Sequence, residues 1–317
     1  MNKEVPIEPI LQIEHLSITF TQYSRGARRR ELPVIRDLSL SLSPGEVTAV
    51  VGASGSGKSL LAHAILGLLP YNSRREGSIL YKGQELTPRR LEKLRGREIS
   101  LVPQGVTYLD PLMKVGPQLT QGRRDIDTRR RAQKALSRYG LGPGTERLYP
   151  FQLSGGMARR VLMASAVMES PQLIIADEPT PGLDAQAAGR LLGHFRELAQ
   201  EGAAVLFITH DLELALTVAH RVAVFYAGET IEEALAPDFE AGSLRHPFTK
   251  ALWDALPQRG FRPIPGSQPY PGEVGEGCPF LGQCPHPGAG CAQGPLPLRP
   301  FQGGAVRCLY PNKEVAP

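Results

Sequence analysis

Residues 52–59, Gly-Ala-Ser-Gly-Ser-Gly-Lys-Ser, match the phosphate-binding pattern G-x-x-x-x-G-K-[ST] at every fixed position. Backbone N–H groups of such a loop wrap the phosphates of a nucleotide, and its glycines let the chain approach them closely. The pattern predicts that Lys58 reaches the β- and γ-phosphates and that the Ser59 hydroxyl binds Mg²⁺. Apolar residues 46–51 and 60–66 predict a buried strand before the loop and a helix after it. This strand–loop–helix unit is typical of an α/β fold, and a plain glycine-rich turn is the alternative.

The composition is that of a globular protein, with 41% hydrophobic and 21% charged residues in a chain of 317. This length accommodates one α/β domain of ordinary size and a smaller second unit. No apolar run approaches the roughly 20 residues that span a bilayer, and the N-terminus lacks the apolar core of a signal peptide. We therefore expect a protein that is soluble, or peripheral on a partner embedded in the membrane.

The net charge of +5 is modest, and its densest basic cluster lies close to Tyr23. The cluster consists of Arg25, Arg28, Arg29 and Arg30. We expect a solvated loop between two edge strands here, with a nucleic-acid patch or contact with anionic lipid as alternatives.

Hydrophobic periodicity predicts two layers of strands. Alternating segments 11–20 and 34–42 form an antiparallel pair ahead of the phosphate loop, and 77–83 adds a strand to that layer. Short apolar runs predict buried core strands at 99–103, 173–176 and 205–209, with helices over 128–139 and 185–200 and a helical pattern from about 110 to 168. Near Leu256 the chain becomes rich in proline and glycine, which indicates a second unit.

Two further motifs can serve a nucleotide. The apolar strand 173–176 leads into Asp177 and Glu178, where Asp177 can hold Mg²⁺ and Glu178 can orient an attacking water as general base. Residues 153–157, Leu-Ser-Gly-Gly-Met, open a helix. Ser154 is suited to cap it, and the N–H groups of its two glycines can bind phosphate. A plain capped helix is the alternative for this second motif.

The order of these motifs along residues 8 to 235 resembles that of the ATP-binding cassette (ABC) ATPases. The resemblance implies a central, mostly parallel sheet, an antiparallel β subdomain and a helical subdomain over about 105–168. It makes Gln104 the glutamine that follows the core strand, Asp184 the aspartate after the acidic pair, and His210 the switch histidine. The residues that it implies for ATP and Mg²⁺ are Phe20, Gly52, Ser54, Gly55, Gly57, Lys58, Ser59, Gln104, Asp177, Ser154, Gly155, Gly156 and Asp184.

Within this set, the resemblance gives catalytic roles to Lys58, Gln104, Glu178 and His210. Phe20 lies where the family has an aromatic side chain that stacks on adenine, with Tyr23 as the competing candidate, and a core role is the alternative for His210. In this family two cassettes form a head-to-tail dimer that holds ATP between the phosphate loop of one and the signature of the other. Met157 stands where the family usually has glutamine, and we expect it to modulate activity without abolishing it.

The C-terminal part narrows the resemblance to peptide and nickel importers. Residues 246–249, His-Pro-Phe-Thr, are similar to the His-Pro-Tyr-Thr segment that follows the cassette in those proteins. We therefore divide the chain into an ATPase domain, 1–240, and an importer-type extension, 241–317. The four cysteines, Cys278, Cys284, Cys291 and Cys308, all lie in this extension, with spacing Cys-x5-Cys-x6-Cys-x16-Cys.

Four thiolates are the ligand set of a [4Fe–4S] cluster and also of tetrahedral zinc. Some members of the family carry a [4Fe–4S] cluster in this extension, so the resemblance favours iron–sulfur over zinc, with unligated thiols as a third alternative. A disulfide framework is not expected, because the sequence has no signal peptide.

The resemblance implies an ATP-hydrolysing subunit of a bacterial importer for di- or oligopeptides, nickel or metallophore complexes. The implied partners are a second, related ATPase subunit, two transmembrane permeases contacted by residues 104–112, and an extracytoplasmic substrate-binding protein. The implied location is peripheral, on the cytoplasmic face of the inner membrane, with no nucleic-acid partner. The segment 104–112 and the signature resemble those of nickel and metallophore importers somewhat more than those of oligopeptide importers.

The alternative function is a soluble, non-transport ABC ATPase that acts on nucleic acid or the ribosome. Relatives of that kind carry long coiled coils or two cassettes in one chain. Here the interval from Ser59 to Leu153 is short and the cassette is single.

Overall fold

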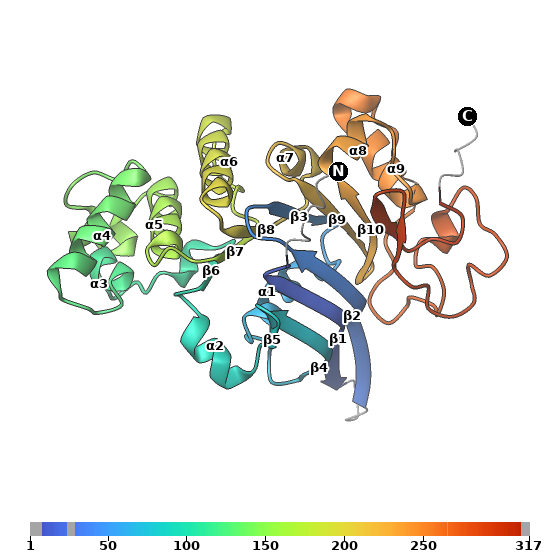
Figure 1. Cartoon of the computed structure of the whole chain (residues 1–317), viewed down its shortest axis with the longest axis horizontal. Coiled ribbons are helices and arrows are strands. Elements are labelled where there is room, and N and C mark those ends of the chain that lie inside the picture. Colours follow the sequence, from blue (N-terminus) through green and yellow to red (C-terminus); the bar gives the residue numbers. More distant parts are fainter. Residues whose placement is uncertain (1–7, 24–28, 265, 312–317) are drawn as a thin grey trace, which may run out of the picture.

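The computed structural model of the chain describes residues 8–23, 29–264 and 266–311, and it is built around two β-sheets (Figure 1). The larger sheet has eight strands in the order β11-β12-β10-β9-β3-β8-β7-β6. These strands are β3 (Val47–Gly52), β6 (Ile99–Val102), β7 (Leu173–Asp177), β8 (Ala204–Thr209), β9 (Arg221–Tyr226), β10 (Glu229–Leu235), β11 (Arg299–Phe301) and β12 (Gly304–Val306).

Five neighbouring strands of this sheet, β6, β7, β8, β3 and β9, are parallel. All residues of β3, β7 and β8 are buried, since helices and the second sheet cover both faces. Nearly continuous runs of Val, Ile, Leu and Ala fit such a position, because neither face meets water. The parallel core predicted from the sequence is therefore confirmed.

The smaller sheet is antiparallel and has the order β2-β1-β4-β5. Its strands are β1 (Leu11–Tyr23), β2 (Arg29–Leu42), β4 (Ser73–Tyr81) and β5 (Gln84–Glu85). The antiparallel layer is confirmed, but its third strand starts at Ser73 and not at Gly77, because Ser73 pairs with Phe20 of β1. Gly77 lies at a register shift with φ +83°, where a Cβ would approach the His15 carbonyl oxygen to 2.4 Å.

Helices surround the sheets, and three of them form a group at one end of the molecule (Figure 1). This group consists of α3 (Val115–Leu119), α4 (Ile126–Arg138) and α5 (Gly155–Val167), and it corresponds to the predicted helical subdomain. The other helices are α1 (Lys58–Ile65), α2 (Pro88–Leu94), α6 (Ala185–Gln200), α7 (Leu212–Leu216), α8 (Ala236–Glu240) and α9 (Pro247–Asp254). Among residues 8–23, 29–264 and 266–311, no helix has the length and apolar character to cross a membrane.

The C-terminal segment contributes to the main sheet. Hairpin β11–β12 pairs with β10 through Glu232↔Val306 and Glu233↔Ala305. The sequence predicts a second unit from about Leu256, and two strands of that region extend the main sheet. The domain boundary at residue 240 stays a prediction. Strand β10, which ends just before that boundary, is the strand with which the C-terminal hairpin pairs.

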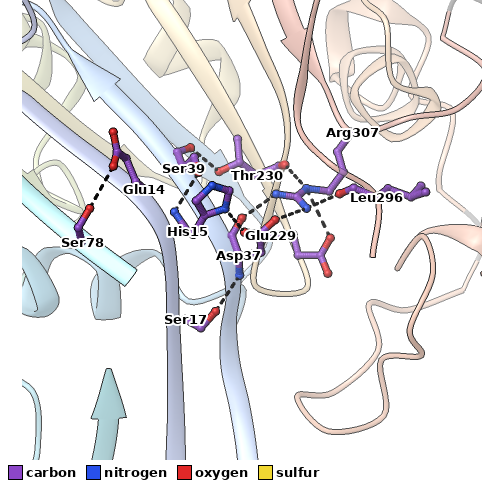
Figure 2. A network of polar contacts seen from close by, with 10 residues as sticks. All are labelled: Glu14, His15, Ser17, Asp37, Ser39, Ser78, Glu229, Thr230, Leu296 and Arg307. Carbon is purple, nitrogen blue, oxygen red and sulfur yellow. Dashed lines mark hydrogen bonds and ion pairs between the residues drawn. The ribbon is translucent and has the colours of Figure 1, made fainter. Parts of the chain in front are cut away.

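Arg307 connects this segment to the antiparallel sheet (Figure 2). It is 2% exposed, and its guanidinium donates to the carboxylate of Asp37 at 3.0 Å, to the Asp37 carbonyl at 2.6 Å and to the Thr230 carbonyl at 3.0 Å. Glu229, whose pKa is raised by burial, lies 3.7 Å away. Partial burial alone would raise the pKa of Asp37, but hydrogen bonds from His15 and Arg307 lower it.

We predict that Arg307→Ala lowers the free energy of unfolding by about 3 kcal/mol, because it removes the hydrogen bonds that the buried guanidinium donates to Asp37 and to the Thr230 carbonyl, and one of the two arginines that face the buried Glu229. Urea unfolding followed by circular dichroism measures the change. Arg29→Ala removes an exposed pair with Glu31 and should cost less than about 0.5 kcal/mol. Equal effects of the two substitutions would contradict the prediction.

Candidate functional site

The phosphate loop lies where β3 ends and α1 begins. Gly52 packs so tightly against β9 that a Cβ would come within 2.3 Å of the Phe225 carbonyl oxygen. Gly57 caps α1 with φ +97°, a conformation that L side chains rarely adopt. Residues 53–55 between them are exposed, so Ser54 and Gly55 present their backbone to solvent. This is the geometry that a phosphate-binding loop requires.

Lys58 is buried beneath this loop. Its ammonium group donates to the carbonyl oxygens of Gly52 at 2.8 Å and Ala53 at 3.0 Å. Burial lowers the pKa of Lys58, and the nearby carboxylates of Asp177 and Glu178 partly offset that effect. A negatively charged phosphate in the loop would stabilise the ammonium more strongly than these neutral carbonyls do.

Asp177, the last residue of β7, meets the first turn of α1. Its carboxylate accepts a hydrogen bond from the Ser59 hydroxyl at 3.0 Å. Burial, together with the charge of Glu178, raises the pKa of Asp177, although the Ser59 bond opposes this. A buried carboxylate beside a hydroxyl is a ligand set suited to Mg²⁺, whose charge would favour the ionised form.

Glu178 follows directly, with φ +45°, and its N–H donates to the Ile208 carbonyl at 2.9 Å. Its carboxylate is 2.9 and 3.0 Å from Nδ1 of His210, the residue after β8. Glu178 is buried and His210 is largely exposed. The pair can therefore hold a water molecule at the solvent-facing edge of the loop and take up its proton.

Arg159 belongs to this site, although the sequence analysis did not single it out. Its guanidinium donates to the Gln104 carbonyl and the Pro179 carbonyl, both at 2.6 Å. Gln104 follows β6, and Pro179 follows Glu178. Arg159 thus ties α5 to two strand ends of the site. An arginine on a helix after a glycine pair carries no sequence signal that predicts such distant contacts.

The signature Leu153–Met157 is not part of this cluster. Ser154 caps α5 by accepting from the Met157 N–H at 3.3 Å, and Ser154 and Gly155 are exposed. Figure 1 shows α5 grouped with α3 and α4, apart from α1. Asp184 is also exposed and caps α6 by accepting from the Ala187 N–H at 2.7 Å. These residues are available to a second molecule.

The two candidates for adenine stacking, both on β1, differ in burial. Phe20 is partly buried against the core, whereas Tyr23 is 74% exposed. The assignment to Phe20 stays a prediction. In the basic cluster, Arg25 and Arg28 lie outside the described residues, and Arg29 pairs with Glu31 at 3.1 Å.

Several large apolar side chains are exposed after Gln104. They are Val106, Tyr108, Leu112 and Met113, of which Leu112 is 87% exposed. Exposed apolar side chains that cluster along one segment are typical of a protein-binding surface.

The four cysteines, separated in sequence, line one cavity of about 10 Å³ together with His246 and His286. All four are thiols. Burial raises the pKa of Cys278 to about 12 and also raises that of Cys308. The Cys278 N–H donates to the Cys291 carbonyl at 2.8 Å, which joins two of the loops that surround the cavity.

These thiols surround a common space without converging on a single point. Among the residues that the structure describes, no group of three or more His, Cys, Asp or Glu side chains is arranged to hold a metal ion as it stands. Four cysteines are nevertheless the residue types that a four-thiolate centre uses, and a bound cation would favour their thiolate forms.

Comparisons with known proteins agree with this geometry. The family profile described as "ABC transporter" matches residues 35–181, and the profile "Oligopeptide/dipeptide transporter, C-terminal region" matches residues 233–291. The oligopeptide transport ATP-binding protein OppD of Salmonella typhimurium strain LT2 is 34% identical, over 98% of this chain and 96% of its own length. The dipeptide transport ATP-binding protein DppD of Bacillus subtilis strain 168 is 35% identical, over 88% of each chain.

Among solved structures, a dimeric ATP-binding cassette in a post-hydrolysis state with ADP and Pi aligns with a TM-score of 0.62. It is 26% identical, and the alignment covers 71% of this chain and 98% of that one. The predicted α/β fold is thereby confirmed as that of a cassette ATPase.

We predict that Lys58→Ala weakens binding of MgATP about 10- to 100-fold, because it removes a charge-assisted hydrogen bond worth about 1.5–3 kcal/mol. Titration calorimetry measures the affinity. Lys82→Ala is the matched control, since Lys82 pairs with Glu98 at 2.6 Å away from the loop, and it should bind MgATP like the unaltered protein. An unchanged affinity in Lys58→Ala would refute the assignment of this loop.

Proposed function

The chain belongs to the ATP-binding subunits of ABC transporters, in the group with the oligopeptide/dipeptide transporter C-terminal region, and we propose that it hydrolyses ATP to drive import of peptides. The observation that carries this proposal is the cluster of Lys58, Ser59, Asp177, Glu178 and His210 at one edge of the parallel sheet. The fold and the site agree with this family, whose members align with nearly the whole chain.

In the proposed reaction, the loop 52–59 and Lys58 hold the phosphates of ATP, while Ser59, Asp177 and Gln104 serve the Mg²⁺. Glu178 accepts a proton from water as the water oxygen forms its bond to the γ-phosphorus. The bond from that phosphorus to the bridging oxygen breaks and leaves ADP and phosphate. His210 orients the Glu178 carboxylate through the contacts at 2.9 and 3.0 Å.

We propose that the site is completed by the signature of a second ATPase subunit. The exposed Ser154 and Gly155 support this, because their N–H groups and hydroxyl are open to a ligand held by another molecule. Gly156 and the exposed Asp184 would belong to the same interface. A related, non-identical subunit is the partner that the family resemblance implies.

Permease subunits are the partners we propose for the apolar surface after Gln104. Val106, Tyr108, Leu112 and Met113 are exposed there, and Arg159 links the Gln104 carbonyl to the strand end at Glu178. A displacement of this surface would therefore be transmitted to Glu178 and His210 through the Arg159 side chain. The protein would act peripherally on the cytoplasmic face of the membrane, with an extracytoplasmic substrate-binding protein delivering the cargo.

We propose peptides as the cargo because the relatives reported above are named peptide transport proteins. The comparisons lend no support to the nickel and metallophore substrates that the sequence analysis also allowed. The alternative of a cassette acting on nucleic acid or the ribosome likewise has no support from them.

We further propose that Cys278, Cys284, Cys291 and Cys308 hold a four-thiolate metal centre. The observation that supports it is their shared cavity, given that up to 16 residues separate neighbouring cysteines in the sequence. An iron–sulfur cluster is the form that the resemblance favours, and zinc is the alternative. In either form the centre would cross-link residues 278 to 308 of the C-terminal segment.

The first experiment reconstitutes the complex with its permeases in proteoliposomes and measures ATP hydrolysis and peptide uptake. Glu178→Gln should lower kcat by about 10²- to 10⁴-fold, because the general base is lost, and uptake should fall with it. Glu240→Gln, an exposed glutamate on α8, is the control and should keep both activities. Hydrolysis lost with uptake retained would overturn the proposed coupling.

The second experiment analyses metal and absorbance in protein purified without oxygen. About four irons with sulfide per chain indicate the cluster and about one zinc indicates the alternative. Cys284→Ser and Cys308→Ser should each lose the metal, whereas Leu309→Ala, beside the same cavity, should retain it. A metal-free, correctly folded protein would contradict the proposed centre.

A further inference from the structure

His246 directly precedes helix α9 and caps it, and it is held by its backbone and its ring. It is 1% exposed. Its N–H donates to the Glu232 carboxylate at 2.7 Å, and its ring atom Nδ1 accepts from the Phe248 N–H at 3.0 Å. Since Nδ1 acts as an acceptor, the proton of the neutral imidazole must lie on Nε2.

This Nε2–H is a buried donor that has no acceptor among the described residues. A buried donor without a partner destabilises the folded state, because it has lost its hydrogen bonds to water without replacing them. The ring lines the cavity that the four cysteines line. In an imidazole the two nitrogens point in nearly opposite directions, so Nε2 faces away from the helix that Nδ1 caps. The structure therefore places a residue with an unused donor on the wall of the cavity that the four cysteines line.

We propose that Nε2–H of His246 donates a hydrogen bond to a sulfur atom of the metal centre held by the four cysteines. This inference rests on the proposed four-thiolate centre. Thiolate or sulfide sulfur carries negative charge and accepts such a bond far better than a thiol does. The same tautomer excludes Nε2 as a metal ligand, because a ligating nitrogen must be unprotonated.

The proposed donor His246 and the proposed ligand Cys308 are both held close to strand β10. Glu232 of β10 binds the His246 backbone and also accepts from the Arg245 N–H at 2.8 Å. The same Glu232 pairs in register with Val306, two residues before Cys308. Strand β10 thus fixes the histidine relative to one of the cysteines, as an outer hydrogen bond to a metal centre requires.

A hydrogen bond to sulfur stabilises the more negative, reduced state of an iron–sulfur cluster and so raises its midpoint potential. In a zinc centre the same bond would stabilise the thiolate and slow release of the metal. His246 is accordingly assigned as a positioning and tuning residue of this centre, and not as a catalytic one.

Two substitutions of His246 test the contributions of its two ring nitrogens separately. His246→Asn keeps an acceptor near Nδ1, and so the helix cap, but removes the far donor. His246→Gln places an amide N–H near Nε2 but loses the cap. Both are made in the full chain purified without oxygen, and metal content is measured for each, followed by redox titration of an iron-loaded protein or zinc release to a chelator.

We expect His246→Asn to keep its metal and to shift the reduced-to-oxidised ratio about tenfold toward the oxidised state at fixed potential, which is ~59 mV for one electron. A zinc form should release metal about tenfold faster. His246→Gln should stay within about twofold of the unaltered protein. Leu309→Ala, on the same cavity but without a side-chain donor, is the control and should leave the ratio within about twofold.

Equal shifts in both His246 variants would show a structural role through the helix cap and would overturn the proposed bond. Loss of the metal in His246→Asn alone would also overturn it, since it would make the histidine a ligand. Unchanged properties of a metal-loaded His246→Asn protein would reject the bond and leave the four-thiolate centre standing. An unaltered protein without metal would reject both.

Discussion

The site depends on five parallel strands that are buried on both faces and end at the same edge of one sheet. Because β3 lies between β8 and β9, the loop after it is placed beside the residues that follow β7 and β8. Gly52 allows this arrangement, since any side chain there would collide with the Phe225 carbonyl. The hydrogen bonds Ser59–Asp177 and His210–Glu178 then join residues that are 118 and 32 positions apart.

Buried charge connects the C-terminal segment to the rest of the molecule. Arg245 and Arg307 are each 2% exposed, and burial raises the pKa of the facing Glu232 and Glu229. Such groups are stable in the interior only when charge and hydrogen bonds compensate their lost hydration. As a result, the strand layer with the candidate adenine residue Phe20 and the segment with the cysteines share one polar network, through Asp37 and Arg307 (Figure 2).

Local patterns predicted the central elements well. The helix at residues 185–200 and the strand that begins at Leu173 follow the pattern of apolar residues. Two elements differed from the prediction, because pairing with strands distant in the sequence determined where they form. Strand β4 extends back to Ser73, where β1 supplies a partner, and hairpin β11–β12 adds to β10 although its sequence is rich in proline and glycine. Arg159 was missed because its contacts with Gln104 and Pro179 arise only when α5 meets the ends of two strands.

The residues that carry the chemistry can be identified from the sequence alone: the phosphate loop at 52–59, the acidic pair Asp177 and Glu178, and four cysteines in the C-terminal segment. These follow from residue type and short spacing, which local backbone geometry enforces. Which of these groups come into contact depends on how the chain folds. The tertiary structure placed the Glu178 carboxylate against His210, left Ser154 and Gly155 of the signature exposed, and brought the four cysteines to the cavity that His246, with its unpartnered donor, also lines. Contacts of that kind depend on sheet order and on the compensation of buried charge, which no single segment encodes.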